Sequence, residues 1–76
     1  MSWQETNNSL TQTYEFADFL EAIKFVNSVA VLAEEAQHHP DIDIRYNKVH
    51  LQLTTHDQGS VVTQKDRELA EQIDTL

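Results

Sequence analysis

The sequence contains no cysteine, which excludes several kinds of protein at the outset. A disulfide-rich secreted scaffold, a thiolate zinc site and a cysteine nucleophile all require thiols. Proteins without disulfides are typical of reducing compartments, so we expect the cytoplasm. Glycine occurs once, at Gly59, and proline once, at Pro40, so the chain has no glycine-rich phosphate loop and no low-complexity tract rich in either residue.

Positive charge is also scarce. Five Lys and Arg residues stand against thirteen Asp and Glu residues, and the formal net charge is −8. A polyanionic backbone would be repelled by such a chain, so we expect no nucleic-acid partner.

The most apolar stretch, residues 19–36, is interrupted by charged side chains, so we expect no membrane partner.

The length of 76 residues limits the chain to one domain, expected over 1–76, with one modest core. A core of this size without a disulfide gives little stability by itself. We therefore expect the chain to associate with copies of itself.

In the N-terminal part, apolar and polar residues approximate an alternation over 10–16, which predicts a half-buried strand. Asn7 and Asn8 before it are typical turn residues. Residues around Trp3 are expected to form the partner strand of an N-terminal hairpin.

A long amphipathic helix is predicted next. Asp18, followed three residues later by Glu21, resembles a capping box. Apolar residues then recur at steps of three and four, at Phe19, Ala22, Ile23, Val26, Val29, Ala30, Ala33 and Ala36. Pro40 forbids further helix, so the end of the helix is expected just before it.

The C-terminal half repeats the pattern of strands followed by a helix. Alternation over 42–46 and 49–54 predicts a second hairpin, and Thr63 followed by Asp66 predicts the start of a short helix. The order strand, strand, helix, strand, strand, helix indicates an α+β fold, with a four-stranded antiparallel sheet and helices packed on one face.

A group of residues able to transfer protons stands out: Glu34, His38, His39, Tyr46, His56 and Asp66. Histidine titrates near pH 6.5, so three histidines with a carboxylate supply both proton donors and acceptors at neutral pH. Spacing alone leaves open that the histidines lie in an exposed loop without a function. His50, in the middle of a predicted strand, is interpreted as a surface residue.

Metal binding is a second hypothesis for the same residues. Glu34 and His38 lie one helical turn apart and could share an ion with His56 or Asp66. His38 and His39 would seldom chelate one ion together, because neighbours in an extended segment project to opposite sides.

In this group of residues, the sequence resembles the pterin-4a-carbinolamine dehydratase family. The residues that match the family motif are Glu34, His38, His39, Pro40, Tyr46, His56 and Asp66. Segments 46–57 and 65–74 also resemble the family, as do the upstream residues Phe16, Asp18, Phe19, Ala22, Phe25, Val29, Ala33 and Glu34. The resemblance therefore covers nearly the whole chain. It implies a dimer, or a dimer of dimers.

The resemblance implies dehydration of 4a-hydroxytetrahydropterin to quinonoid dihydropterin and water, with no cofactor and no metal. The expected catalytic residues are His38, His39, His56 and Asp66; the expected pterin contacts are Glu34, Thr55 and Asp57. His38 and His39 are expected to act on the hydroxyl group and His56 on the ring nitrogen. A non-catalytic dimerisation module of the same fold and a small metal-binding protein remain as alternatives.

The chain departs from the family at several positions. Ile42 stands where an aromatic residue is usual, Gln12 where arginine is common, and one additional residue separates His56 from Asp66. The chain also starts late, and we expect it to lack the N-terminal helix of longer members.

Overall fold

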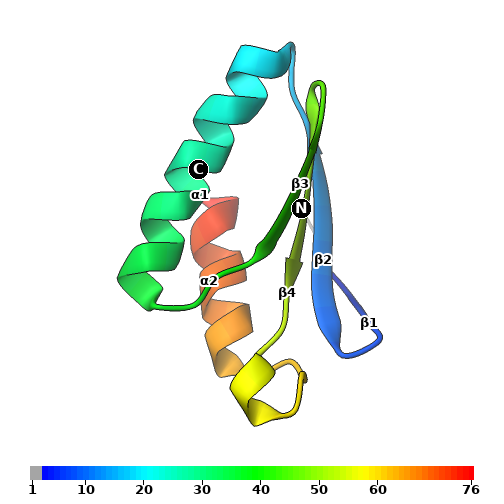
Figure 1. The fold of residues 1–76 in the computed structure, drawn as a ribbon, viewed down its shortest axis with the longest axis vertical. Coiled ribbons are helices and arrows are strands. Elements are labelled where there is room, and N and C mark those ends of the chain that lie inside the picture. Colours follow the sequence, from blue (N-terminus) through cyan, green and yellow to red (C-terminus); the bar gives the residue numbers. More distant parts are fainter. Residues whose placement is uncertain (1–2) are drawn as a thin grey trace.

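The computed structural model describes residues 3–76, so the first two residues of the expected 1–76 domain lie outside the described part. The elements are β1 (Gln4–Thr6), β2 (Ser9–Glu15), α1 (Phe19–Ala36), β3 (Asp41–Arg45), β4 (Lys48–Leu53), a 3-10 turn η1 (His56–Gln58) and α2 (Gln64–Asp74). This order confirms the predicted α+β fold, and Figure 1 shows both helices on the same face of the sheet. The turn η1 is an element that the sequence patterns did not predict.

The described strands form one antiparallel sheet in the order β1-β2-β4-β3. Both hairpins are as predicted, and β4 pairs with β2, so the second hairpin lies against the first through its later strand. The turn between β1 and β2 places Asn7 and Asn8 at φ values of 52° and 63°. Asparagine tolerates this left-handed conformation, which explains the turn at this position.

Helix α1 begins as the sequence predicts, because the Asp18 side chain accepts a hydrogen bond from the Glu21 amide at 2.9 Å. It ends earlier than Pro40 alone requires. Gln37 adopts a left-handed conformation with φ of 52°, and its amide bonds back to the last turn of the helix. Both histidines therefore lie beyond the helix, in the extended segment that leads to β3.

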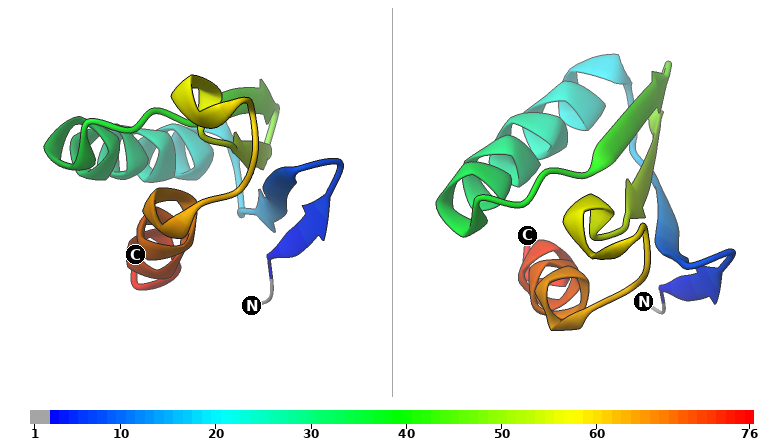
Figure 2. Two further views of the ribbon diagram at one scale, coloured as in Figure 1. Left: turned by 90° about the horizontal axis from the view of Figure 1, so that it is seen from below. Right: turned by 60° about the horizontal axis from the view of Figure 1, so that its bottom comes forward.

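The core lies between the sheet and the two helices. Its buried apolar side chains are Leu10, Ala22, Val29, Val49, Leu51, Leu53, Leu69, Ala70 and Ile73. Alternate residues of β4 point to the other face, which the views in Figure 2 show without a covering helix. Within residues 3–76, no helix has the length and apolar character needed to cross a membrane.

Candidate active site

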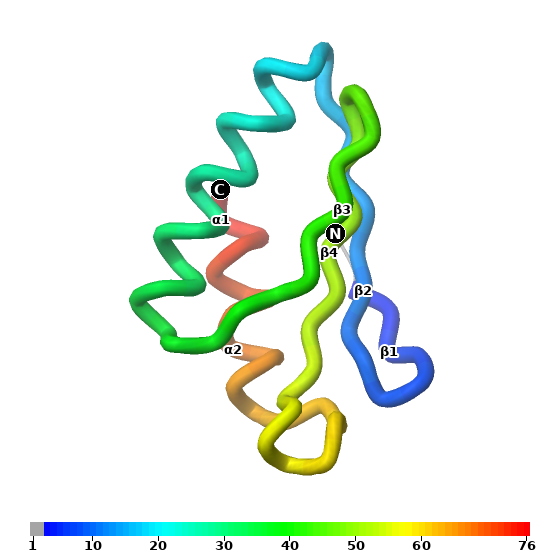
Figure 3. Tube along the Cα trace, viewed as in Figure 1, coloured from blue at the N-terminus to red at the C-terminus, as the bar shows by residue number. Residues whose placement is uncertain are grey.

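Three segments far apart in the sequence meet at one end of the molecule. In the views of Figures 1 and 3, the end of α1, the end of β4 with η1, and the start of α2 all lie at the lower end. The segment after α1 carries His38 and His39, η1 carries His56, and the first turn of α2 carries Asp66. The fold thus brings together the four residues that the sequence predicted to be catalytic.

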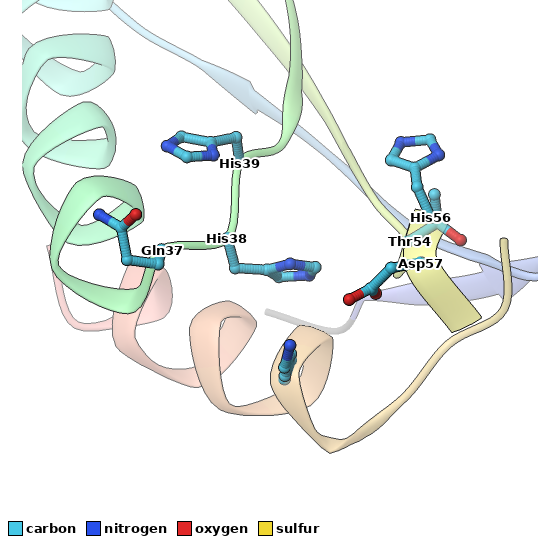
Figure 4. A pocket seen from close by; sticks show the side chains of 7 residues that line it. Gln37, His38, His39, Thr54, His56 and Asp57 are labelled. Atoms are coloured by element: carbon cyan, nitrogen blue, oxygen red, sulfur yellow. The ribbon is translucent and has the colours of Figure 1, made fainter. Parts of the chain in front are cut away.

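A hollow of about 250 Å³ opens at this end, lined by Gln37, His38, His39, Thr54, His56, Asp57 and Lys65. Figure 4 shows that His38 and His39 approach it from one side, whereas His56 and Asp57 approach it from the other. Three imidazoles therefore surround one space from two independent segments.

His38 is paired with a buried carboxylate. Its Nε2 lies 2.5 Å from Oδ1 of Asp66, and the two side chains are 10% and 0% exposed. A carboxylate only accepts hydrogen bonds when ionised, so His38 carries its proton on Nε2 in this pair. Nδ1 is then the nitrogen that is left to take or give a proton.

The second oxygen of Asp66 is held by two other donors. Oδ2 accepts from the Thr55 hydroxyl at 2.7 Å and from the Thr63 amide at 2.8 Å. Burial raises the pKa of Asp66, but the hydrogen bonds from His38, Thr63 and Thr55 outweigh burial and hold it below its usual value of 3.8. Asp66 is therefore an anion at neutral pH.

His39 has a carboxylate partner of a different kind. Its Nε2 lies 2.5 Å from Oε2 of Glu34, in the last turn of α1, and the two side chains are 59% and 71% exposed. Glu34, predicted to contact the pterin, is not among the residues that line the hollow. Its observed contact is with His39.

The other two predicted pterin contacts have different positions. Asp57 lines the hollow, and in Figure 4 its carboxylate points toward the side that His38 occupies. Thr55 is 1% exposed, and its hydroxyl contacts Asp66 and Thr63 instead of the hollow. Thr55 thus differs from its neighbours Thr54 and His56, which both line the hollow.

Three lining residues were missed by the sequence analysis: Gln37, Thr54 and Lys65. Each is adjacent in sequence to a predicted site residue, and Thr54 and Lys65 also lie in the segments 46–57 and 65–74 that resemble the family. Tyr46, which matches the family motif, is 69% exposed in the turn between β3 and β4 and does not line the hollow.

His50 lies away from this site. It is on β4, on the sheet face opposite the helices, and its Nδ1 lies 2.8 Å from the Thr13 hydroxyl.

Metal binding is a poor fit to the observed contacts, because Glu34 and His38 each bind a different partner. Among the residues that the structure describes, no three His, Cys, Asp or Glu side chains form a group that could hold a metal ion.

The chain matches the family model described as pterin 4 alpha carbinolamine dehydratase over residues 1–76. A relative from Thermomicrobium roseum is 54% identical over 97% of this chain and 78% of its own length. A relative from Sulfolobus acidocaldarius is 43% identical over 97% of this chain and 80% of its own. Both carry the provisional name pterin-4-alpha-carbinolamine dehydratase.

Two solved structures share the fold. A transcriptional coactivator/pterin dehydratase from Brucella melitensis has a TM-score of 0.89 and 32% identity, covering 96% of this chain and 79% of the other. A pterin dehydratase-like protein identified as a RuBisCO assembly factor in the alpha-carboxysome has a TM-score of 0.82, covering 99% and 88%. At 24% identity, the second likeness concerns the fold alone.

Proposed function

Because this chain belongs to the pterin 4 alpha carbinolamine dehydratase family, we propose that it converts 4a-hydroxytetrahydropterin to quinonoid dihydropterin and water. The observation that supports this proposal best is the hollow surrounded by His38, His39 and His56. Three imidazoles around one space are suited to a reaction that consists of two proton transfers and the cleavage of one carbon–oxygen bond.

The reaction needs an acid and a base on one substrate. The bond from C4a to the hydroxyl oxygen breaks, and the oxygen leaves as water once it has received a proton. The adjacent ring nitrogen gives up its proton to a base, and its electron pair forms the new double bond to the ring carbon. Each positioned proton transfer contributes on the order of 10²- to 10⁴-fold to the rate.

The two-sided arrangement of the histidines suggests the assignment of roles. His38 and His39 approach from the segment after α1 and are assigned to the hydroxyl group, while His56 approaches from η1 and is assigned to the ring nitrogen. Asp66 is fully buried, so we propose that it orients the His38 ring and does not contact the pterin. Asp57 and Lys65 provide polar groups for the pterin edge.

The activity is tested with chemically generated 4a-hydroxytetrahydropterin, followed by stopped-flow absorbance with and without a chelator. We expect the purified protein to accelerate dehydration equally in both conditions, because histidines need no metal for this chemistry. A rate equal to that of the reaction in buffer alone would refute the dehydratase activity and favour a non-catalytic module of the same fold. Activity that is lost to the chelator and restored by zinc would favour the metal hypothesis.

We also propose that the chain works in the cytoplasm as at least a dimer. Strands β1 and β3 are the edges of the described sheet, and edge strands carry backbone groups that a second copy can pair. Ile42 on β3 is 38% exposed and would gain burial there. Light scattering after gel filtration measures the mass, and a monomer that persists at high concentration contradicts the proposal.

A further inference from the structure

Thr55 does not line the hollow, although its neighbours in sequence, Thr54 and His56, both do. It follows β4 directly and precedes His56, and it is 1% exposed. Its backbone closes the loop that carries His56, because its amide donates to the Val61 carbonyl at 2.9 Å and its carbonyl accepts from the Ser60 amide at 3.1 Å. The backbone of Thr55 is thereby fixed on the His56 side of the hollow.

The side chain of Thr55 points to the other side of the site. Its hydroxyl donates to Oδ2 of Asp66 at 2.7 Å, and its oxygen also lies 2.7 Å from the Thr63 hydroxyl. A hydroxyl has one hydrogen, and Thr55 gives it to the carboxylate, so the Thr63 hydroxyl is the donor in the second bond. The Thr63 hydroxyl thus donates to Thr55, and the Thr55 hydroxyl donates to Asp66.

Asp66 depends on such bonds for its orientation. The last torsion of an aspartate side chain has a broad, two-fold preference, so the plane of the carboxylate is set by its hydrogen bonds and hardly by the torsion itself. Thr55 and Thr63 both bind Oδ2, which leaves Oδ1 directed at Nε2 of His38. Without the hydroxyl, one of the two bonds that fix Oδ2 is lost.

The neighbouring Thr54 cannot take over this role. Its hydroxyl donates to the Asn8 carbonyl at 2.9 Å, in the turn between β1 and β2. The two consecutive threonines therefore have separate functions in the fold, and the one that contacts Asp66 is Thr55.

We propose that Thr55 is a positioning residue, whose buried hydroxyl fixes the Asp66 carboxylate and thereby keeps His38 in the tautomer with its proton on Nε2. The kinetic part of this inference rests on the proposed dehydratase function, whereas the tautomer of His38 does not. Thr55 is separated from the hollow, so its hydroxyl acts through Asp66 and His38 and not by binding the substrate.

Two variants of Thr55 separate the hydroxyl from the methyl group. Thr55→Val keeps the shape and removes the donor, whereas Thr55→Ser keeps the donor and removes the methyl group. Thr13→Val is the matched control, because it removes a different threonine hydroxyl, which contacts His50 on the opposite face of the sheet. Circular dichroism establishes that each variant is folded.

The first measurement is the nitrogen-15 NMR spectrum of the His38 ring, which distinguishes the tautomers without any substrate. We expect Thr55→Val to lose the preference for the proton on Nε2, while Thr55→Ser and Thr13→Val retain it. A wild-type His38 spectrum in Thr55→Val would overturn the proposal. If Thr55→Val does not fold, Thr55→Ala removes the same donor, and a wild-type spectrum there would overturn the proposal equally.

The second measurement is steady-state dehydration over a range of pH. We expect Thr55→Val to lower kcat on the order of tenfold or more with KM nearly unchanged, and to alter the pH profile, since the misplaced group is His38. Thr55→Ser should restore kcat. Equal losses in the valine and serine variants would mean that the methyl group matters for packing, against the proposal. An inactive wild-type protein with the expected NMR result would refute the dehydratase function alone.

Discussion

The two histidines after α1 each bind a carboxylate, but their surroundings are opposite. In the pair of His38 with Asp66, the side chains are 10% and 0% exposed; in the pair of His39 with Glu34, they are 59% and 71% exposed. The distance from Nε2 to the carboxylate oxygen is the same, 2.5 Å, in both pairs. Their difference therefore lies in burial and in the number of further bonds.

Burial and further hydrogen bonds hold the pair of His38 with Asp66 in one arrangement. Asp66 binds Thr55 and Thr63 in addition to His38, so its orientation is fixed from several directions. The pair of His39 with Glu34 is largely exposed to solvent, where charged groups attract each other weakly and exchange partners easily. We infer that His38 is held in one geometry, whereas His39 can turn toward a ligand.

The largest difference is expected when each carboxylate is removed. Asp66→Ala leaves three buried or half-buried donors without this acceptor, so we expect it to lower the free energy of unfolding by about 3 kcal/mol. Glu34→Ala should cost less than about 1 kcal/mol, as is usual for exposed pairs. Urea unfolding followed by circular dichroism measures both, and equal losses would contradict the contrast between the pairs.

Removal of the histidines should affect turnover in both pairs but stability in only one. We expect His38→Ala and His39→Ala each to lower kcat on the order of 100-fold, because both line the hollow. His38→Ala should also destabilise the fold, since it leaves the buried Asp66 carboxylate without that partner. His50→Ala is the control, and a loss of turnover there equal to the other two would mean that the site is misassigned.

Acid should weaken the buried pair in a defined direction. The pKa of Asp66 in the folded protein lies below its usual value of 3.8, so the unfolded chain takes up this proton first as the pH falls. The stabilisation is complete above about pH 4 and is lost as the pH falls through the lowered pKa. Urea midpoints between pH 5 and pH 2 should therefore fall more steeply in the wild type than in Asp66→Asn, and parallel curves would disprove this linkage.

Much of the fold could be predicted from the sequence, because the periodicities of 10–16 and 49–54 reflect burial on one face of a sheet. The alternation over 42–46 also predicted β3, although Ile42 and Tyr46 are exposed. The end of α1 at Ala36 could not, since it depends on the left-handed conformation of Gln37, a residue with no special preference for it. The turn η1 was missed for a related reason: it is short and has no buried residue, so it carries no apolar period.

The site could be predicted in its chemistry but not in its pairings. The residue types and the resemblance singled out the histidines and Asp66, yet which carboxylate binds which histidine depends on how α2 packs against the end of α1. Thr55 shows this limit most clearly. The resemblance implied a pterin contact for Thr55, but the alternation that would predict the direction of its side chain ends with β4 at Leu53.

The smallest expected effect concerns the exposed pair, and salt is the means to reveal it. Glu34→Gln removes the charge beside His39 but keeps a side chain of similar shape, so we expect kcat to change by a few-fold at low ionic strength. Salt screens exposed charges within about 3 Å at 1 M, compared with about 30 Å at 0.01 M. Raising the salt should therefore reduce the difference between Glu34→Gln and the wild type. The difference between Asp66→Asn and the wild type should remain, because buried pairs are screened much less. Stopped-flow rates of the three proteins at both salt concentrations provide the measurement, and a salt-independent effect of Glu34→Gln would place Glu34 in a fixed contact like that of Asp66.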